Sequence, residues 1–118
     1  KWGTKMTTHI KIKKLTGSYV LRAGGAVLGE ADEVLELSES GHPPIIYFNR
    51  ADIAMDFFDK STKESQCPHK GQATYYSIIA KSGPIKDAAW SYENPIKEVA
   101  EIKDYLAFHS DKATVEEL

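Results

Sequence analysis

The chain has 118 residues, of which 42% are hydrophobic and 27% charged, and its formal net charge is −2. These values are typical of one folded domain with a single hydrophobic core, and they exclude a disordered chain. Its basic residues are interleaved with acidic ones, so we expect no nucleic-acid partner. No apolar run is long enough to span a bilayer, so we also expect no membrane association.

The single cysteine, Cys67, excludes an internal disulfide and a multi-thiolate zinc cage. A reducing cytoplasm is the simplest compartment for such a chain, and we expect no cofactor. Because Met6 resembles a natural start, residues 1–8 are expected to be disordered or added for expression. We expect a single domain over residues 9–109 and a fraying tail over residues 110–118.

The first half of the chain is predicted to form short strands separated by turns. Residues 9–13 alternate between apolar and polar side chains, which is the period of a half-buried strand. Related patterns predict strands at 18–23, 26–28, 33–37 and 45–48, a turn at 17–18, a loop or bulge at 29–32 and a loop at 38–44. The glycine pair at 24–25 predicts a tight hairpin turn. Residues 49–55 are predicted to form one helical turn with Asn49 as its N-cap.

The second half is predicted to add further strands and one helix. The polar segment 60–66 is predicted to be a mobile loop. Strands are predicted at 73–80, 85–93 and 105–108. A helix is predicted to begin at Asn94 and Pro95 and to run to about residue 104, because proline is favoured at the first helical position. We therefore predict a mainly β, compact single domain of antiparallel sheets, with one C-terminal helix and short helical turns.

The turn at residues 66–71 brings several reactive side chains together. It contains Cys67, His69 and Lys70, and the pair of Pro68 and Gly71 fixes the backbone on either side of the lysine. A loop carried by a rigid scaffold is a common position for binding and catalytic groups. Lys70 can offer a point charge to a phosphate or a carboxylate, and the alternative is an ordinary solvated lysine. We expect the working site to be built around this turn.

Cys67 and Asp52 are the candidate catalytic residues. A nearby cation favours the nucleophilic thiolate, although a free cysteine is also common as a small buried hydrophobe. Asp52 follows a predicted buried strand together with Arg50. Either these two form a structural ion pair, or they face a cleft as general base and anion-binding donor. One thiolate and scattered histidines do not predict a metal site.

Aromatic residues form the second part of the candidate site. Trp90 and Tyr92 lie two residues apart on a predicted strand and therefore share one of its faces. Tyr47, Tyr75 and Tyr76 add further rings. These side chains either pack in the core or form the wall of a pocket, and both alternatives stay open.

Four segments, in this order, resemble the domain of unknown function 427 family. They lie at residues 46–52, 67–76, 88–95 and 105–108. The resemblance extends from about residue 25 to residue 108, and it is most specific in the Cys-Pro-x-Lys-Gly and Ala-Trp-Ser-Tyr segments. It implies a mainly antiparallel fold of two crossed sheets, similar to the β-tent proteins. Many of those proteins hold a structural zinc with two Cys-x-x-Cys pairs, which this chain lacks.

The resemblance implies no reaction. A nucleotidyltransferase label attached to the family is not matched here, because the chain has no Gly-Ser followed by paired aspartates for two metal ions. This chain also has Asn49 and His69 where family members often have proline and tyrosine. The positions that match the family motifs are Tyr47, Arg50, Asp52, Cys67, Lys70, Gly71, Trp90 and Tyr92.

These observations predict a small polar and aromatic pocket near the Cys67 turn. Trp90, Tyr92 and Tyr47 would form its walls, and Lys70 with Arg50 would recognise a small anionic or polar metabolite. Whether such a protein also catalyses a reaction stays open. The alternative is a non-catalytic interaction or regulatory module that forms a homodimer through the aromatic face or an exposed strand edge.

Overall fold

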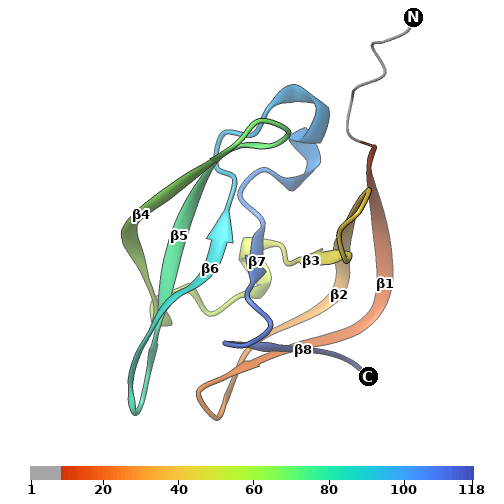
Figure 1. The fold of residues 1–118 in the computed structure, drawn as a ribbon. Helices are drawn as coiled ribbons and strands as arrows, with labels where there is room; N and C mark the ends of the chain where they lie inside the picture. The colour runs from red at the N-terminus through yellow and green to blue at the C-terminus, as the bar shows by residue number, and fades with distance from the viewer. Residues whose placement is uncertain (1–8) are drawn as a thin grey trace, which may run out of the picture.

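The computed structural model describes residues 9–118 and consists mainly of antiparallel strands (Figure 1). The strands form two four-stranded sheets, ordered β3-β2-β1-β8 and β4-β5-β6-β7. This confirms the prediction of a mainly β fold built from antiparallel sheets. In chain order the elements, with 3₁₀ turns labelled η, are β1 (Ile10–Ala23), β2 (Ala26–Glu39), β3 (Ile45–Tyr47), η2 (Arg50–Asp52), η3 (Met55–Phe57), β4 (Phe58–Cys67), β5 (Gly71–Ala80), β6 (Gly83–Ser91), η4 (Lys97–Ile102), β7 (Leu106–Phe108) and β8 (Thr114–Glu117).

The first hairpin is longer and more continuous than predicted. The turn at residues 24–25 is confirmed, and both glycines have positive φ angles of 57° and 78°. The turn predicted at residues 17–18 is wrong, because these residues lie inside β1 at a register shift between Thr16 and Tyr19. A bulge bends a strand without ending it, and sequence pattern alone does not distinguish a bulge from a turn.

The segment predicted as a mobile loop at residues 60–66 is instead part of β4. This strand pairs with β5 on one side and forms an edge of its sheet, and nearly all of its side chains are exposed. When both faces of an edge strand are exposed to solvent, its side chains do not alternate between apolar and polar. Its charged residues also protect the free edge from pairing with another chain.

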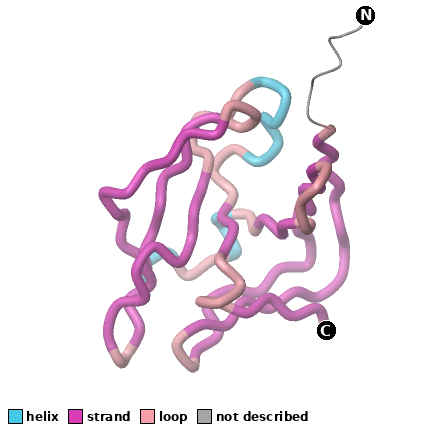
Figure 2. The backbone as a smooth tube through the Cα atoms, viewed as in Figure 1, coloured by secondary structure: helices cyan, strands magenta, loops and turns pink. Residues whose placement is uncertain are grey.

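The predicted C-terminal helix is wrong. Its place is taken by η4, a six-residue 3₁₀ segment with a non-helical backbone at Val99. Figure 2 shows only short helical turns between the strands. Val99 and Ile102 are both buried, and a spacing of three residues suits a 3₁₀ turn as well as an α-helix. The short helical turn predicted after Asn49 is confirmed, and the Asn49 side chain accepts a hydrogen bond from the Ala51 amide.

The fraying tail predicted over residues 110–118 is also wrong in part. Residues Thr114–Glu117 form β8, which pairs with β1 over four positions from Tyr19 to Arg22. A charged, short strand on a sheet edge has little hydrophobic signal of its own, so only its partner strand identifies it. The expectation for residues 1–8 lies outside the described residues. Within the described part of the chain, no helix is long and apolar enough to cross a membrane.

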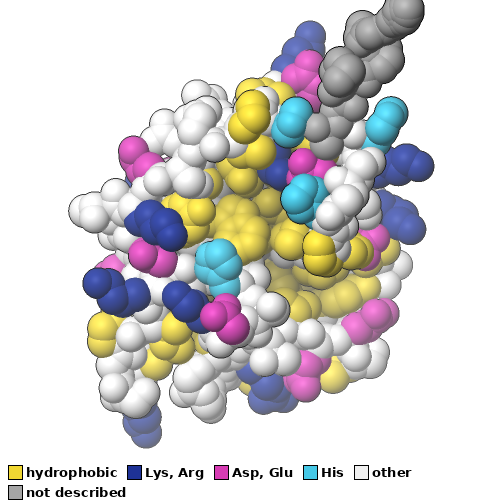
Figure 3. Space-filling view, viewed as in Figure 1, with side chains coloured by type: hydrophobic (Ala, Val, Ile, Leu, Met, Phe, Trp, Pro, Cys, Tyr) yellow, Lys and Arg dark blue, Asp and Glu magenta, His cyan; other side chains and the backbone are white. Residues whose placement is uncertain are grey.

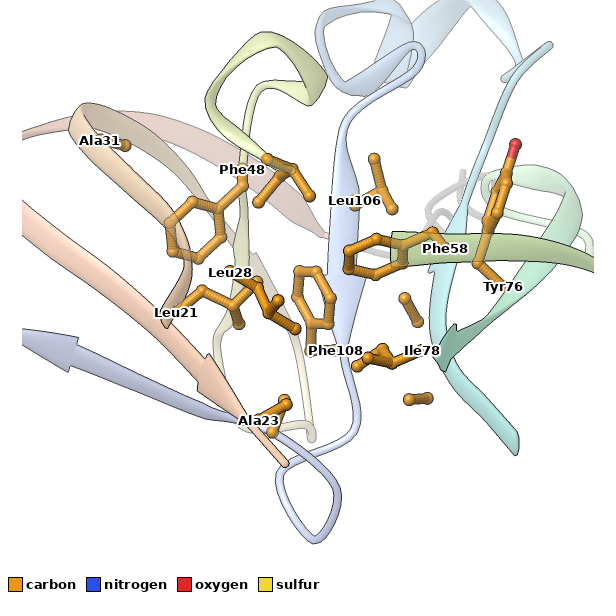
Figure 4. Packing of buried hydrophobic residues seen from close by; sticks show 14 of the residues in the cluster. Leu21, Ala23, Leu28, Ala31, Phe48, Phe58, Tyr76, Ile78, Leu106 and Phe108 are labelled. Atoms are coloured by element: carbon orange, nitrogen blue, oxygen red, sulfur yellow. The ribbon is translucent and has the colours of Figure 1, made fainter. Parts of the chain in front are cut away.

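A backbone bridge connects the two halves of the fold where Phe48 and Leu106 lie next to each other. The Phe48 amide donates to the Leu106 carbonyl at 2.8 Å, and the Leu106 amide donates to the Phe48 carbonyl at 2.9 Å. Both side chains are fully buried in the first hydrophobic cluster, which lies between the sheets (Figure 4). Because side chains alternate along a strand, the neighbours Tyr47 and Ala107 belong to a second cluster on the other face.

The second cluster is only partly covered by other elements. Val99 and Ile102 of η4 pack against it. Elsewhere its aromatic residues, among them Trp90 and Tyr92, line an open cavity. The fold therefore places an apolar sheet face beside a hollow, and this hollow holds most of the residues that the sequence singled out.

Candidate functional site

The candidate site is a cavity of about 420 Å³ on the face of the second cluster. It opens between the ends of the two sheets, and Figure 3 shows a hollow with an apolar floor and histidine side chains around it. Its lining residues are Leu37, Glu39, His42, Pro43, Ile45, Tyr47, Cys67, Lys70, Tyr75, Trp90, Tyr92 and His109. Five of the eight residues predicted from the sequence converge here, namely Tyr47, Cys67, Lys70, Trp90 and Tyr92.

The polar end of the cavity is an ion pair between Lys70 and Glu39. The Lys70 Nζ atom donates to Glu39 Oε1 at 2.7 Å, and both side chains are largely buried, with 12% and 13% of their surface exposed. The hydrogen bond from Lys70 holds the pKa of Glu39 below its usual range. Lys70 is therefore a fixed, neutralised cation rather than a free one.

The aromatic wall is fixed by contacts among its own members. The Trp90 indole Nε1 donates to the Tyr47 hydroxyl at 3.2 Å, and the two rings meet edge to face. Burial raises the pKa of Tyr47 to about 12 and also raises the pKa of Tyr92. Tyr92 is largely buried, with an exposed fraction of 7%. Its hydroxyl has no hydrogen-bond partner among residues 9–118. This hydroxyl is available to a ligand.

His109 lines the cavity beside Trp90 and Tyr75. Its ring lies 4.7 Å from the Trp90 ring centroid and stacks on Tyr75 at 6.4 Å. Burial lowers the pKa of His109 below its usual value, so the neutral imidazole is favoured at neutral pH. A neutral ring in contact with two aromatic rings extends the aromatic wall of the cavity.

The β4–β5 turn presents Cys67 and Lys70 to the cavity. The Lys70 amide donates to the Cys67 carbonyl at 3.2 Å, which closes the turn, and the Lys70 carbonyl accepts from Ile96 at 2.9 Å. Gly71 has a φ of +116°, and a Cβ there would lie 3.3 Å from the Asn94 carbonyl oxygen. Gly71 therefore contributes by letting the turn pack on the segment before η4, and it does not line the cavity.

Cys67 is half-buried, with its thiol 3.7 Å from Lys70 Nζ. Its expected partner in catalysis, Asp52, is not at this site. Asp52 lies in η2 and lines a different hollow together with the acidic residues Glu30 and Asp32. The structure therefore does not bring the predicted nucleophile and the predicted base together.

Arg50 also lies outside the cavity. Its guanidinium donates to the Tyr76 hydroxyl, the Ser91 hydroxyl, the Glu93 carboxylate and the Asp104 carbonyl, at 3.0–3.2 Å. The sequence left two alternatives for Arg50 and Asp52, an ion pair with each other or a shared cleft. Neither holds, because Arg50 forms its ion pair with Glu93 and Asp52 lines a separate hollow. These bonds connect η2 to β5 and β6, so Arg50 holds the scaffold together.

The sequence reasoning missed Glu39. This residue is separated from Lys70 by 31 positions and lies on the other sheet, so no local pattern links the two. His42 and His109, two of the scattered histidines, also line the cavity. Among the described residues, no group of three or more histidine, cysteine, aspartate or glutamate side chains is placed to hold a metal ion.

Comparison with protein-family models matches residues 11–117 to NTP_transf_9, described as a domain of unknown function (DUF427). The match covers nearly all of the chain, including both sheets and β8. No curated protein matches this chain.

Proposed function

Given that this chain belongs to the DUF427 family, whose description assigns no activity, we propose that it binds a small polar metabolite in the aromatic cavity. The observation that carries this proposal is the convergence of five motif residues on one hollow with an ion pair at its polar end. A cavity of about 420 Å³ lies within the range of small-molecule sites, which combine apolar walls with a few fixed polar groups.

The polar end suits a ligand that both donates and accepts hydrogen bonds. Lys70 Nζ carries three donors, of which one is directed at Glu39 and a second at the Cys67 sulfur, so one is left for a ligand. The second carboxylate oxygen of Glu39 can act as the acceptor. Because the two charges neutralise each other, the pair favours a neutral or zwitterionic group over a net anion. The anionic ligand expected from Lys70 and Arg50 together loses support, since Arg50 is occupied by Glu93.

The proposal assigns binding and requires no reaction. Cys67, the candidate nucleophile, lines the cavity, whereas Asp52, the candidate base, lines a separate hollow. A positioned base within hydrogen-bond reach is what activates a nucleophile. As part of the same proposal we place this role in the cytoplasm, where a single free thiol is kept reduced.

A thermal-shift screen against nucleotides, sugars, amino acids, amides and organic acids tests this function. A ligand that binds only the folded state raises the melting temperature by an amount set by its concentration over its Kd. We expect a hit with the wild type that is lost in Lys70→Ala. Each variant is compared with its own ligand-free melting temperature, because Lys70→Ala also leaves Glu39 without its partner.

Lys81→Ala is the matched control, because Lys81 is an exposed turn lysine outside the cavity. The hit should persist in this variant. A hit that persists equally in Lys70→Ala would contradict the proposed site. No hit across the panel would overturn the binding function, and a homodimer through the aromatic face, tested by sizing the protein in solution, would replace it.

A further inference from the structure

A second cavity, of about 500 Å³, adjoins the first one. The two cavities share four lining residues, namely Pro43, Ile45, Trp90 and His109. A molecule that rests on Trp90 in the first cavity therefore contacts residues that also line the second.

The second cavity lies near the Phe48–Leu106 pair, which forms the backbone bridge between the end of β3 and β7. From β7 the chain leads on to β8, at the edge of the first sheet (Figure 1). The cavity is lined by side chains from all three strands, including Ile46, Phe108 and Val115.

The two cavities differ in chemistry. The first contains Glu39, Lys70 and the tyrosine hydroxyls. The residues that line the second include no acidic side chain and no lysine or arginine, and most are apolar, among them Pro44, Ile46 and Val115. The combined site therefore has an ion pair at one end and no acidic, lysine or arginine side chain at the other.

We propose that the ligand is amphipathic, with a polar amide head at the Lys70–Glu39 pair and an aliphatic tail in the second cavity. This inference rests on the function proposed above and names its ligand class. A primary amide has one acceptor oxygen for Lys70 and N–H donors for Glu39, and it brings no net charge to a pair that is already neutral. The tail removes its own apolar surface and that of the cavity from water.

The test is a chain-length series of acetamide, butanamide, hexanamide and octanamide, with Kd values from NMR titration of the Trp90 indole N–H. We expect affinity to rise about fourfold for each added methylene, the effect of burying one methylene in an apolar site. Intermolecular contacts from the terminal methyl of hexanamide should reach Val115, which lines the second cavity.

Thr114→Trp fills the second cavity from an exposed strand position, where tryptophan is well tolerated. We expect this variant to lose the chain-length gain and to bind acetamide as the wild type does. Asp111→Trp is the matched control, because Asp111 is exposed nearby and lines neither cavity. It should keep the full gain.

Three results would overturn the inference: a Kd independent of chain length, a gain that persists in Thr114→Trp, or a terminal methyl without contacts to the second cavity. If no amide binds while the screen finds a polar ligand lost in Lys70→Ala, the ligand class is wrong and the proposed function stands. If the screen also fails, both are wrong.

Discussion

At the residue scale, the central feature is the pairing of Lys70 with Glu39. A lysine with only 12% of its side chain exposed would be costly to bury alone, and the carboxylate 2.7 Å away compensates for its charge. The same bond sets the polar character of the cavity, because it turns a point charge into a donor and acceptor pair. One contact thus serves both stability and the proposed ligand preference.

The acid sensitivity of the protein should reflect this pair. Because the folded-state pKa of Glu39 is lowered, its contribution to the free energy of unfolding is complete above the unfolded carboxyl pKa and is lost as the pH falls through the folded value. We expect the wild type to lose more stability than Glu39→Gln between about pH 6 and about pH 3, by about 1 kcal/mol and by less than about 2 kcal/mol, because protonation of the unfolded carboxyl with its pKa of about 4.3 sets the upper limit.

Urea unfolding of both proteins at several pH values measures this difference. Glu93 also has a lowered pKa, but it is present in both proteins and its effect cancels in the comparison. Parallel stability curves for the wild type and Glu39→Gln would contradict this prediction, because they would mean that ionisation of Glu39 adds nothing to the stability at neutral pH.

At the element scale, the β4–β5 turn is held by its contact with the segment that leads into η4. The Lys70 carbonyl accepts the Ile96 amide, and Gly71 allows the close approach to Asn94. The position of Cys67 and Lys70 in the cavity therefore depends on a contact between two segments that are distant in sequence.

Gly71→Ala should disturb this contact. Its φ of +116° is unfavourable for alanine, and the new Cβ would lie 3.3 Å from the Asn94 carbonyl oxygen. We expect a destabilisation of about 1–3 kcal/mol, measured by urea unfolding. Gly41→Ala is the control, because Gly41 also has a positive φ, of +81°, but has no atom within 4 Å of the added Cβ. Equal losses in the two variants would mean that backbone strain alone, rather than docking of the turn, accounts for the effect.

At the scale of the whole molecule, the two sheets depend on the junction at Phe48 and Leu106. Each sheet supplies part of the first hydrophobic cluster, and the cavity lies on the other side of the same junction. Tyr47 and Ala107 are held at the cavity face by the burial of their neighbours in the chain. The site therefore requires both sheets to be folded together.

Leu106→Ala should weaken both sheets. Leu106 is fully buried, and truncation of a buried leucine costs about 2–5 kcal/mol. Hydrogen exchange should accelerate in β1 and β2 as well as in β5 and β6. Ile79→Ala is the control, because Ile79 is 43% exposed and its loss should be small. Faster exchange confined to one sheet would show that the sheets unfold separately.

Local sequence signals were sufficient for the elements that have a clear pattern. The strand at 73–80, the glycine turn at 24–25 and the cap at Asn49 follow from alternation, backbone freedom and side-chain hydrogen bonding. The family motifs also placed Lys70 and Trp90 in the predicted site, and the structure brings these two residues into one cavity. Their role in binding stays a prediction.

Tertiary structure alone decided the remainder. The edge strands β4 and β8 have few apolar residues, so their partners rather than their composition define them. The pairing of Glu39 with Lys70, and the separation of Asp52 from Cys67, depend on how the two sheets meet. The sequence pattern predicts on which face of its own strand a side chain lies. The distance between side chains on different strands is set by the packing of the whole chain.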